Sequence, residues 1–302
     1  MNNFKNVIFV SFIFNLLSIT FAKDITVIAH RGASGYLPEH TLEAASLAHG
    51  FNVDYIEPDL VMTKDNKIIV LHDIYLDTTT NIAKVFPNRS RKDKKFYAID
   101  FTLNEIKMLR VHEREKSGKR VFNKRFPKRS SKFEIPTLSE FIELIQGLNK
   151  SRNKNIGIYP EIKKPEFHLR EGKDITKAVI KILRKYKYET EGKIFVQCFW
   201  PETLKRLKDE FKTKIPLVQL IADNSWSESS ADYLKMLTQK GLKEISSYAK
   251  GIGPWLSQVI NKKGKSTGLV ENAKRYGLVV HPYTHRSEQV PGIFKTESNF
   301  FH

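Results

Sequence analysis

The sequence of 302 residues contains a single cysteine, so no disulfide can form within the chain. That residue, Cys198, lies in the apolar run IFVQCF without a histidine or asparagine partner pattern, and we expect a buried, unreactive thiol. The run GASG lacks both the lysine of a phosphate-binding loop and the glycine spacing of a dinucleotide-binding loop. These absences exclude a disulfide-stapled scaffold and argue against a cysteine enzyme or a nucleotide-loop protein.

Apolar runs long enough to insert into a membrane are scarce, and the one candidate is at the N-terminus. Residues 1–22 resemble a secretory signal, with Lys5 at the start, the apolar run VIFVSFIFNLLSIT and small residues at the cleavage positions of Thr20-Phe21-Ala22. An uncleaved anchor is the alternative, but the run is short for a span and is broken by Asn15. We therefore predict a signal peptide over residues 1–22 and a secreted chain.

Acidic residues are under-represented, and the formal net charge is +18. Between Arg89 and Lys132 there are 16 Lys or Arg against 5 Asp or Glu, which places +11 in this stretch. The stretch is either a solvated surface insertion or a region that attracts anionic substrates or a membrane surface. Nucleic acid is not an expected partner, because the aromatic residues in this stretch are not spaced as a stacking platform.

Strand-like and helix-like runs alternate along the rest of the chain, which favours a parallel α/β fold. Strands are expected at 25–30, 55–62, 67–72, 155–162, 193–199, 216–221, 251–256 and 278–284, and helices at 41–50, 173–188, 201–211, 233–251 and 269–277. Only three residues separate the second and third strands, so the third is expected to be the antiparallel arm of a hairpin. Seven strands of the βα type remain, one fewer than a (β/α) barrel requires.

Carboxylates follow several of the predicted strands. Glu57 and Asp59 are two residues apart on one strand, so both point to the same face. Glu161 near the end of another strand could add a third carboxylate, although alone it could be an ordinary surface residue. Buried carboxylates are costly unless they are paired or bind a cation. Three of them without cysteine or clustered histidine suit Ca²⁺ or Mg²⁺ better than Zn²⁺.

Two histidines lie at strand ends, His30 beside Arg31 and His72 beside Asp73. Either could be a structural group, but together they suggest an acid/base pair that works near neutral pH. The guanidinium of Arg31 can bind phosphate oxygens in a bidentate manner. Lys163 lies two residues after Glu161 and therefore faces the same side. The combination predicts a metal-assisted phosphate site.

These motifs, in the runs AHRGASGYLPEHTLEAASLAHG, DYIEPDLVMTKDNKIIVLHD and NIGIYPEIKKPEFH, resemble the bacterial periplasmic-type glycerophosphodiester phosphodiesterases. The resemblance covers most of the chain from about Asp24 to Glu288. It implies a TIM-type barrel over residues 24–288 with an insertion at about 75–135. It also implies that the protein is located in the periplasm. It further implies metal-dependent hydrolysis of glycerophosphodiesters to sn-glycerol 3-phosphate and an alcohol, with Ca²⁺ as the expected cation and Mg²⁺ as the alternative.

Matched to the family motifs, the resemblance implies a role for each residue of the predicted site. Glu57, Asp59 and Glu161 would be the metal ligands. His30 and His72 would be the acid/base pair. The resemblance does not assign the two roles, and the prediction of His30 as the base and His72 as the acid is our own. Arg31 and Lys163 would neutralise the phosphate.

The chain departs from the family pattern after Glu288. Residues 289–302 form a divergent tail that is too short for a βα unit, which takes about 30 residues, so the last unit is expected to be missing. An active phosphodiesterase therefore competes with a second hypothesis, a truncated, non-catalytic or unstable relative with at most ligand or surface binding. Action on lipid-sized phosphodiesters is a further alternative, which the motifs around His40 and His281 disfavour.

Overall fold

The computed structural model describes residues 25–127, 132–286 and 288. The predicted signal peptide, 1–22, and the predicted divergent tail, 289–302, lie outside these described residues. Within the described part of the chain, no helix combines the length and the apolar character that a membrane span requires.

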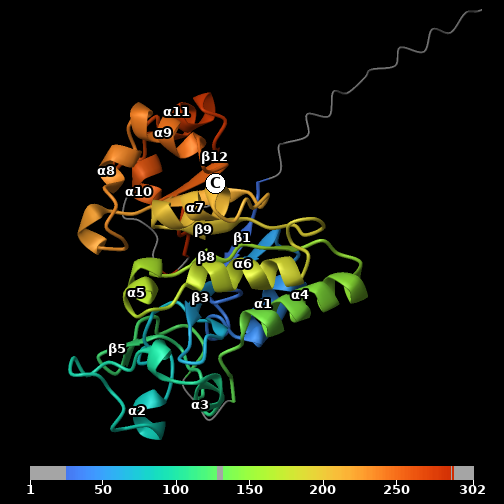
Figure 1. Ribbon diagram of the computed structural model, residues 1–302, viewed down its shortest axis with the longest axis vertical. Helices are drawn as coiled ribbons and strands as arrows, with labels where there is room; N and C mark the ends of the chain where they lie inside the picture. Colours follow the sequence, from blue (N-terminus) through green and yellow to red (C-terminus); the bar gives the residue numbers. More distant parts are fainter. Residues whose placement is uncertain (1–24, 128–131, 287, 289–302) are drawn as a thin grey trace, which may run out of the picture.

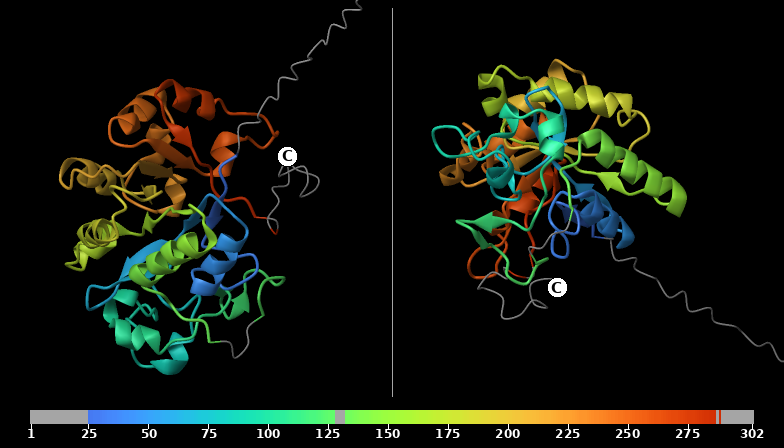
Figure 2. Two further views of the ribbon diagram at one scale, coloured as in Figure 1. Left: turned by 90° about the vertical axis from the view of Figure 1, so that its right-hand side faces the viewer. Right: turned by 90° about the horizontal axis from the view of Figure 1, so that it is seen from below.

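Seven parallel strand positions form the central sheet, and helices lie around its outside (Figures 1 and 2). In spatial order they are β1 (Ile28–His30), β2 with β3 (Tyr55–Glu57 and Asp59–Met62), β7 with β8 (Gly157–Ile158 and Glu161–Ile162), β9 (Val196–Cys198), β10 (Leu217–Ile221), β11 (Gly251–Pro254) and β12 (Val279–Val280). The predicted parallel arrangement of the strands is confirmed. Among the described residues, β1 and β12 are the two ends of this order.

Prolines interrupt two of these strand positions. Pro58 separates β2 from β3, and Pro160 lies between β7 and β8. Proline has no backbone N–H to donate to a neighbouring strand, so the regular ladder breaks at these points. Both breaks lie beside the acidic residues of the predicted site.

The larger helices cover the outer face of the sheet, and side-chain caps set several of their boundaries (Figure 1). They are α1 (Leu42–Gly50), α4 (Leu138–Arg152), α6 (Ile175–Lys185), α7 (Pro201–Asp209), α9 (Gln239–Ser246) and α11 (Leu269–Arg275). Thr41 caps α1 as predicted, because its side chain accepts a hydrogen bond from the Ala44 N–H. The single helix predicted over 233–251 is wrong. It is two helices, α8 (Tyr233–Met236) and α9, because Thr238 caps the second.

The hairpin and the insertion depart from the βα pattern. Strand β4 (Ile68–Val70) pairs antiparallel with β3, which confirms the predicted hairpin. Between β4 and α4 the chain forms α2 (Ile82–Val85), the 3₁₀ turn η1 (Ala98–Asp100), α3 (Leu103–Lys107) and the hairpin β5–β6 (Glu115–Lys116, Lys119–Arg120). These elements lie together at one end of the molecule (Figure 1). They have their own apolar core, which includes Leu76, Phe101 and Leu109.

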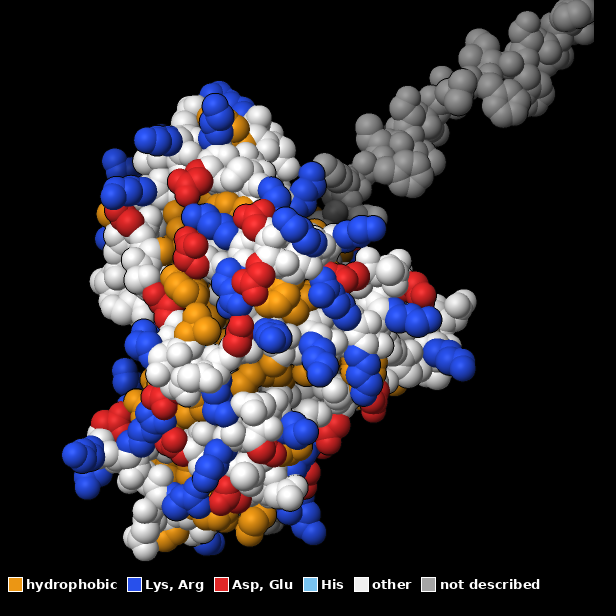
Figure 3. Space-filling model, in the orientation of Figure 1, with side chains coloured by type: hydrophobic (Ala, Val, Ile, Leu, Met, Phe, Trp, Pro, Cys, Tyr) orange, Lys and Arg blue, Asp and Glu red, His pale blue; other side chains and the backbone are white. Residues whose placement is uncertain are grey.

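Part of the positive charge of the insertion is paired with nearby carboxylates. Arg89 bonds Glu105, Lys107 bonds Glu140, and Arg91 contacts Asp100. Figure 3 shows acidic side chains among the basic ones on the face it presents. The excess of cations in the sequence is therefore partly neutralised by neighbouring carboxylates.

The cysteine is buried, as predicted. The Cys198 thiol is 0% exposed and donates to the Ile162 carbonyl oxygen at 3.3 Å. Burial raises the pKa of this thiol to about 12. A thiol with such a pKa is protonated at neutral pH and therefore a poor nucleophile.

Candidate active site

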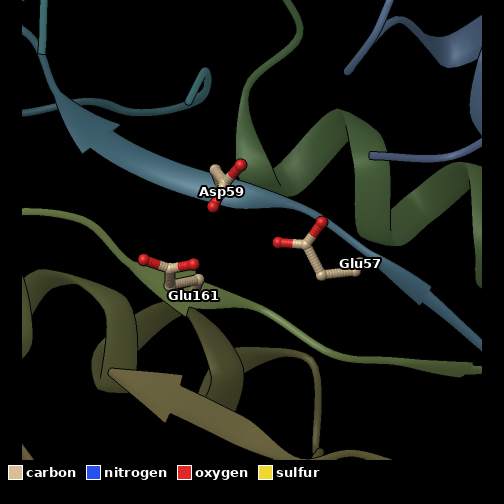
Figure 4. A group of neighbouring side chains, drawn as sticks. All are labelled: Glu57, Asp59 and Glu161. Carbon is tan, nitrogen blue, oxygen red and sulfur yellow. The ribbon is translucent and has the colours of Figure 1, made fainter. Parts of the chain in front are cut away.

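Three buried carboxylates meet inside the sheet. One oxygen from each of Glu57, Asp59 and Glu161 lies within 4.8 Å of the others. Asp59 and Glu161 are register partners on the neighbouring strands β3 and β8, and Glu57 ends β2 just before Pro58. Figure 4 shows the three side chains converging from these strands. The predicted acidic cluster is therefore formed by two adjacent strand positions.

The three carboxylates do not ionise alike. Burial, with the charges of the other two, raises the pKa of Glu57 well above its usual range. Burial also raises the pKa of Glu161, although Lys163 opposes this shift. Burial acts in the same direction on Asp59, but Lys163, His72 and a hydrogen bond from His40 outweigh it and hold the Asp59 pKa well below its usual range. All three carboxylates can therefore be ionised together only if additional positive charge lies beside them.

The donor set fits a hard divalent cation. The Oε1 atom of Glu57 is buried without a hydrogen-bond partner, so it leaves a lone-pair acceptor unused in the interior. Carboxylate oxygens are the preferred ligands of Ca²⁺ and Mg²⁺. Among the described residues, Glu57, Asp59 and Glu161 form the one acidic group whose spacing could hold a metal ion.

Lys163 links the acidic cluster to one of the predicted catalytic histidines. Its Nζ lies 2.7 Å from Glu161 Oε1, 3.9 Å from Asp59 Oδ1 and 3.4 Å from His72 Nε2. Although burial opposes its charge, these carboxylates raise the Lys163 pKa above its usual value. The ammonium is therefore charged and faces the centre of the site.

The HRG motif forms a tight turn at the end of β1. His30 is the register partner of Glu57, and the Arg31 N–H donates to Glu57 Oε2 at 2.8 Å. Gly32 has φ +75°, and a Cβ there would lie 2.9 Å from the Ala44 carbonyl carbon. Only glycine fits this approach to α1 without strain. Burial, with the charge of Arg31, holds the His30 pKa well below its usual range, so His30 is neutral.

His72 enters from the hairpin arm. Strand β4 runs beside β3, and the Leu71 N–H donates to the Asp59 carbonyl oxygen. The next residue, His72, places Nδ1 2.6 Å from Asp73 Oδ1, so Nδ1 donates and Nε2 faces Lys163. Burial, followed by the charges of Arg31 and Lys163, lowers the His72 pKa to about 4.

The structure thus brings all seven predicted site residues into one cluster. Residues 30–298 match the model described as the glycerophosphoryl diester phosphodiesterase family. The chain belongs to this family. The match spans the HRG, acidic, HD and lysine motifs, and it covers most of the chain.

Relatives in this family are similar over nearly the whole chain. A glycerophosphodiester phosphodiesterase of Haemophilus influenzae is 42% identical, over 93% of this chain and 84% of the relative. One from Treponema pallidum is 33% identical, over 93% of this chain and 86% of the relative. The solved structure of an Oleispira antarctica phosphodiesterase, in complex with the product sn-glycerol-3-phosphate, is 21% identical with a TM-score of 0.61. It covers 87% of this chain and 85% of its own and supports the TIM-type barrel fold.

Residues that the sequence reading gave no role also belong to the site. His40 Nε2 lies 2.7 Å from Asp59 Oδ2. Glu39 accepts hydrogen bonds from Arg31, and Arg114 of the insertion contacts both Glu39 and Asp73. The pair Glu39-His40 lies only eight residues after the HRG motif and could have been suspected from that proximity. Arg114 gave no such signal, because it is one basic residue among many in its stretch.

Proposed function

We propose that this family member hydrolyses glycerophosphodiesters to sn-glycerol 3-phosphate and an alcohol, with a divalent cation. The observation that carries the proposal is the buried cluster of Glu57, Asp59 and Glu161 with Lys163 and two histidines beside it. The relatives named glycerophosphodiester phosphodiesterase, at 33% and 42% identity, support the same substrate class.

The residues proposed to bind the cation and those proposed to bind the substrate phosphate form two groups. Glu57, Asp59 and Glu161 would hold the cation, for which we propose Ca²⁺, with Mg²⁺ as the alternative. When bound, the cation supplies Lewis-acid stabilisation of negative charge on the phosphoryl oxygens. Arg31 and Lys163 would offset the charge of the phosphodiester, which otherwise repels a nucleophile.

The two histidines are proposed to move the protons. Neutral His30 takes a proton from the attacking hydroxyl as that oxygen bonds to phosphorus. When water attacks, this step gives glycerol 3-phosphate directly. When the glycerol hydroxyl of the substrate attacks, it gives a cyclic glycerol phosphate, and a water molecule then opens that ring to give glycerol 3-phosphate. The bond from phosphorus to the alcohol oxygen breaks, and His72 gives the departing oxygen a proton. Asp73 on Nδ1 favours the charged imidazolium that this step needs. Burial, followed by the charges of Arg31 and Lys163, lowers the His72 pKa in the free protein, and the negative substrate would offset these two charges.

The proposal is tested by glycerol 3-phosphate release from glycerophosphocholine by the purified chain without residues 1–22. Release is expected with Ca²⁺, and it should stop on addition of EDTA and return with excess Ca²⁺. A comparison of Ca²⁺ with Mg²⁺ at equal free concentration would identify the better cation. A lysophospholipid substrate would test the lipid-sized alternative.

The competing hypothesis of a non-catalytic relative makes opposite predictions. It expects no release from a sample whose circular dichroism shows a folded α/β protein. A truncated and unstable chain would instead aggregate early on heating, without a Ca²⁺-dependent rise in melting temperature. Either result would contradict the proposed enzyme.

We also propose that the N-terminal segment directs the chain to the periplasm, on the basis of the signal-like pattern of residues 1–22. N-terminal sequencing of the chain from the periplasmic fraction of a Gram-negative host should then begin at Lys23.

We propose in addition that the insertion contacts an anionic membrane surface, on the basis of the charge excess of residues 89–132. Co-sedimentation with phosphatidylglycerol vesicles, but not with phosphatidylcholine vesicles, is the expected result, and equal binding to both would contradict it.

A further inference from the structure

One side chain of the insertion reaches the residues that hold the predicted catalytic groups. Arg114 donates from Nη2 to Glu39 Oε1 at 2.6 Å and from Nε to Glu39 Oε2 at 3.0 Å. Its Nη1 donates to Asp73 Oδ2 at 2.7 Å. One guanidinium therefore joins two carboxylates that come from different parts of the chain.

Each of these carboxylates holds a residue of the proposed reaction. Both oxygens of Glu39 accept from Arg31 Nη1, at 3.0 and 3.1 Å. Asp73 accepts from His72 Nδ1 through one oxygen and from Thr78 through the other. The contacts form a continuous path from Arg31 through Glu39, Arg114 and Asp73 to His72.

The backbone of Arg114 is held by the segment that follows the HD motif. On either side of Arg114 in the sequence, the N–H groups of His112 and Glu115 donate to the carbonyl oxygens of Thr79 and Thr78, each at 2.8 Å. The Arg114 side chain is 16% exposed, against 4% for Glu39 and 14% for Asp73. The guanidinium is thus fixed from both ends in a largely buried setting.

We propose that Arg114 is a positioning residue for the hydrolysis, which fixes His72 and Arg31 through Asp73 and Glu39. This inference rests on the proposed function and adds the insertion to the parts that build the site. Without Arg114, Glu39 loses two charge-assisted hydrogen bonds and Asp73 loses one, and each carboxylate can rotate away from its partner. A lysine would not replace it, because the point charge of an ammonium cannot reproduce the planar pair of bonds from Nε and Nη2 to Glu39 together with the bond from Nη1 to Asp73.

The test compares Arg114→Ala and Arg114→Lys with a matched control, Arg110→Ala. Arg110 lies on the same segment but pairs with Glu134 at the surface, where the two side chains are 39% and 47% exposed. For Arg114→Ala we expect kcat for glycerophosphocholine to fall by about 10- to 100-fold with little change in KM, as for other residues that orient catalytic groups. Guanidinium ion at non-denaturing concentration should restore part of the lost kcat, whereas equal sodium chloride should not. Arg110→Ala should behave as wild type.

Wild-type kcat in Arg114→Ala would overturn the proposal. The proposal would also fail if guanidinium does not restore the lost kcat and the melting temperature of Arg114→Ala is lower than that of wild type. Arg114 would then have a structural role. A second readout needs no turnover. The downfield proton resonance of the His72 Nδ1–H, assigned with His72→Gln, should be present in wild type and lost in Arg114→Ala.

The two readouts separate this inference from the proposed function. If the wild type releases no glycerol 3-phosphate, the enzyme proposal fails, and the His72 resonance alone decides the role of Arg114. An unchanged resonance in Arg114→Ala would show that Asp73 and His72 keep their geometry without it, which would reject the positioning role.

Discussion

Replacing His72 by alanine is expected to lower kcat for glycerophosphocholine by about 10²- to 10⁴-fold, the usual contribution of a positioned general acid or base. The reason is that choline leaves as a basic alkoxide unless it is protonated. His72 is the histidine whose Nδ1 is held by a carboxylate, Asp73. The measurement is steady-state release of glycerol 3-phosphate by wild type and variant under the same Ca²⁺ concentration.

A change of leaving group separates the acid from the base. With a glycerophosphodiester of p-nitrophenol, which leaves without a proton, His72→Ala should lose much less activity, whereas His30→Ala should lose similar activity on both substrates. His112→Ala is a matched control, because its imidazole donates to the backbone oxygen of Glu113 in the insertion. If His72→Ala is equally impaired on both substrates, His72 is not the acid. If either variant keeps wild-type activity on glycerophosphocholine, that histidine is outside the mechanism.

Glu57→Gln is expected to abolish both activity and the stabilisation that Ca²⁺ gives. Lewis-acid stabilisation contributes several kcal/mol, so kcat should fall at least about 10³-fold. At Ca²⁺ about 100-fold above its Kd, wild type should gain about 2.7 kcal/mol of stability, and the variant should gain little. The metal-free variant should be about as stable as metal-free wild type, because burial already favours the neutral form of Glu57 and the amide keeps an oxygen that can accept from the Arg31 N–H.

Thermal melting of both proteins in EDTA and in Ca²⁺ checks this prediction. Glu166→Gln serves as a control, because Glu166 is a glutamate that contacts Ser230 away from the acidic cluster. An undiminished Ca²⁺-dependent rise in the melting temperature of Glu57→Gln would show that the cation binds elsewhere.

The effect of Ca²⁺ on stability should also grow with pH. The pKa of Glu161 rises from its ordinary value of 4.5 to about 8 in the metal-free protein. Between these values the folded state holds a proton that the unfolded state has lost, so metal-free stability falls as pH rises through this window. The cation needs ionised carboxylates, so its binding expels the proton and is stronger at pH 8 than at pH 6. A Ca²⁺-dependent gain in melting temperature that is independent of pH would contradict this linkage.

Several parts of the site could be predicted because they are local. Glu57 and Asp59 share a face through the two-residue period of a strand, and their proximity survives the break at Pro58. The hairpin that brings His72 beside β3 follows from a connection of three residues. The N-cap of α1 at Thr41 is likewise a property of neighbouring residues. The parallel α/β fold with seven strands of the βα type followed from the alternation of such units.

Other parts could not be predicted because several outcomes fit the same local pattern. The sequence of residues 233–251 is compatible with one helix. In the structure α8 ends at Met236, and Thr238 caps the start of α9. A threonine is compatible with a helix interior and with a cap, and the packing around it makes the choice. The predicted absence of a last βα unit stays a prediction, since residues 289–302 lie outside the described residues.

The sequence by itself determined the residue types of the site, their faces on the strands and the family to which they belong. Only the tertiary structure decided which charges meet. Arg114 lies 75 positions from Glu39 and 41 from Asp73, in a stretch where basic residues look alike. An ion pair depends on distance through space, and that distance is fixed by the packing of the insertion against the barrel, for which no spacing along the chain provides a signal.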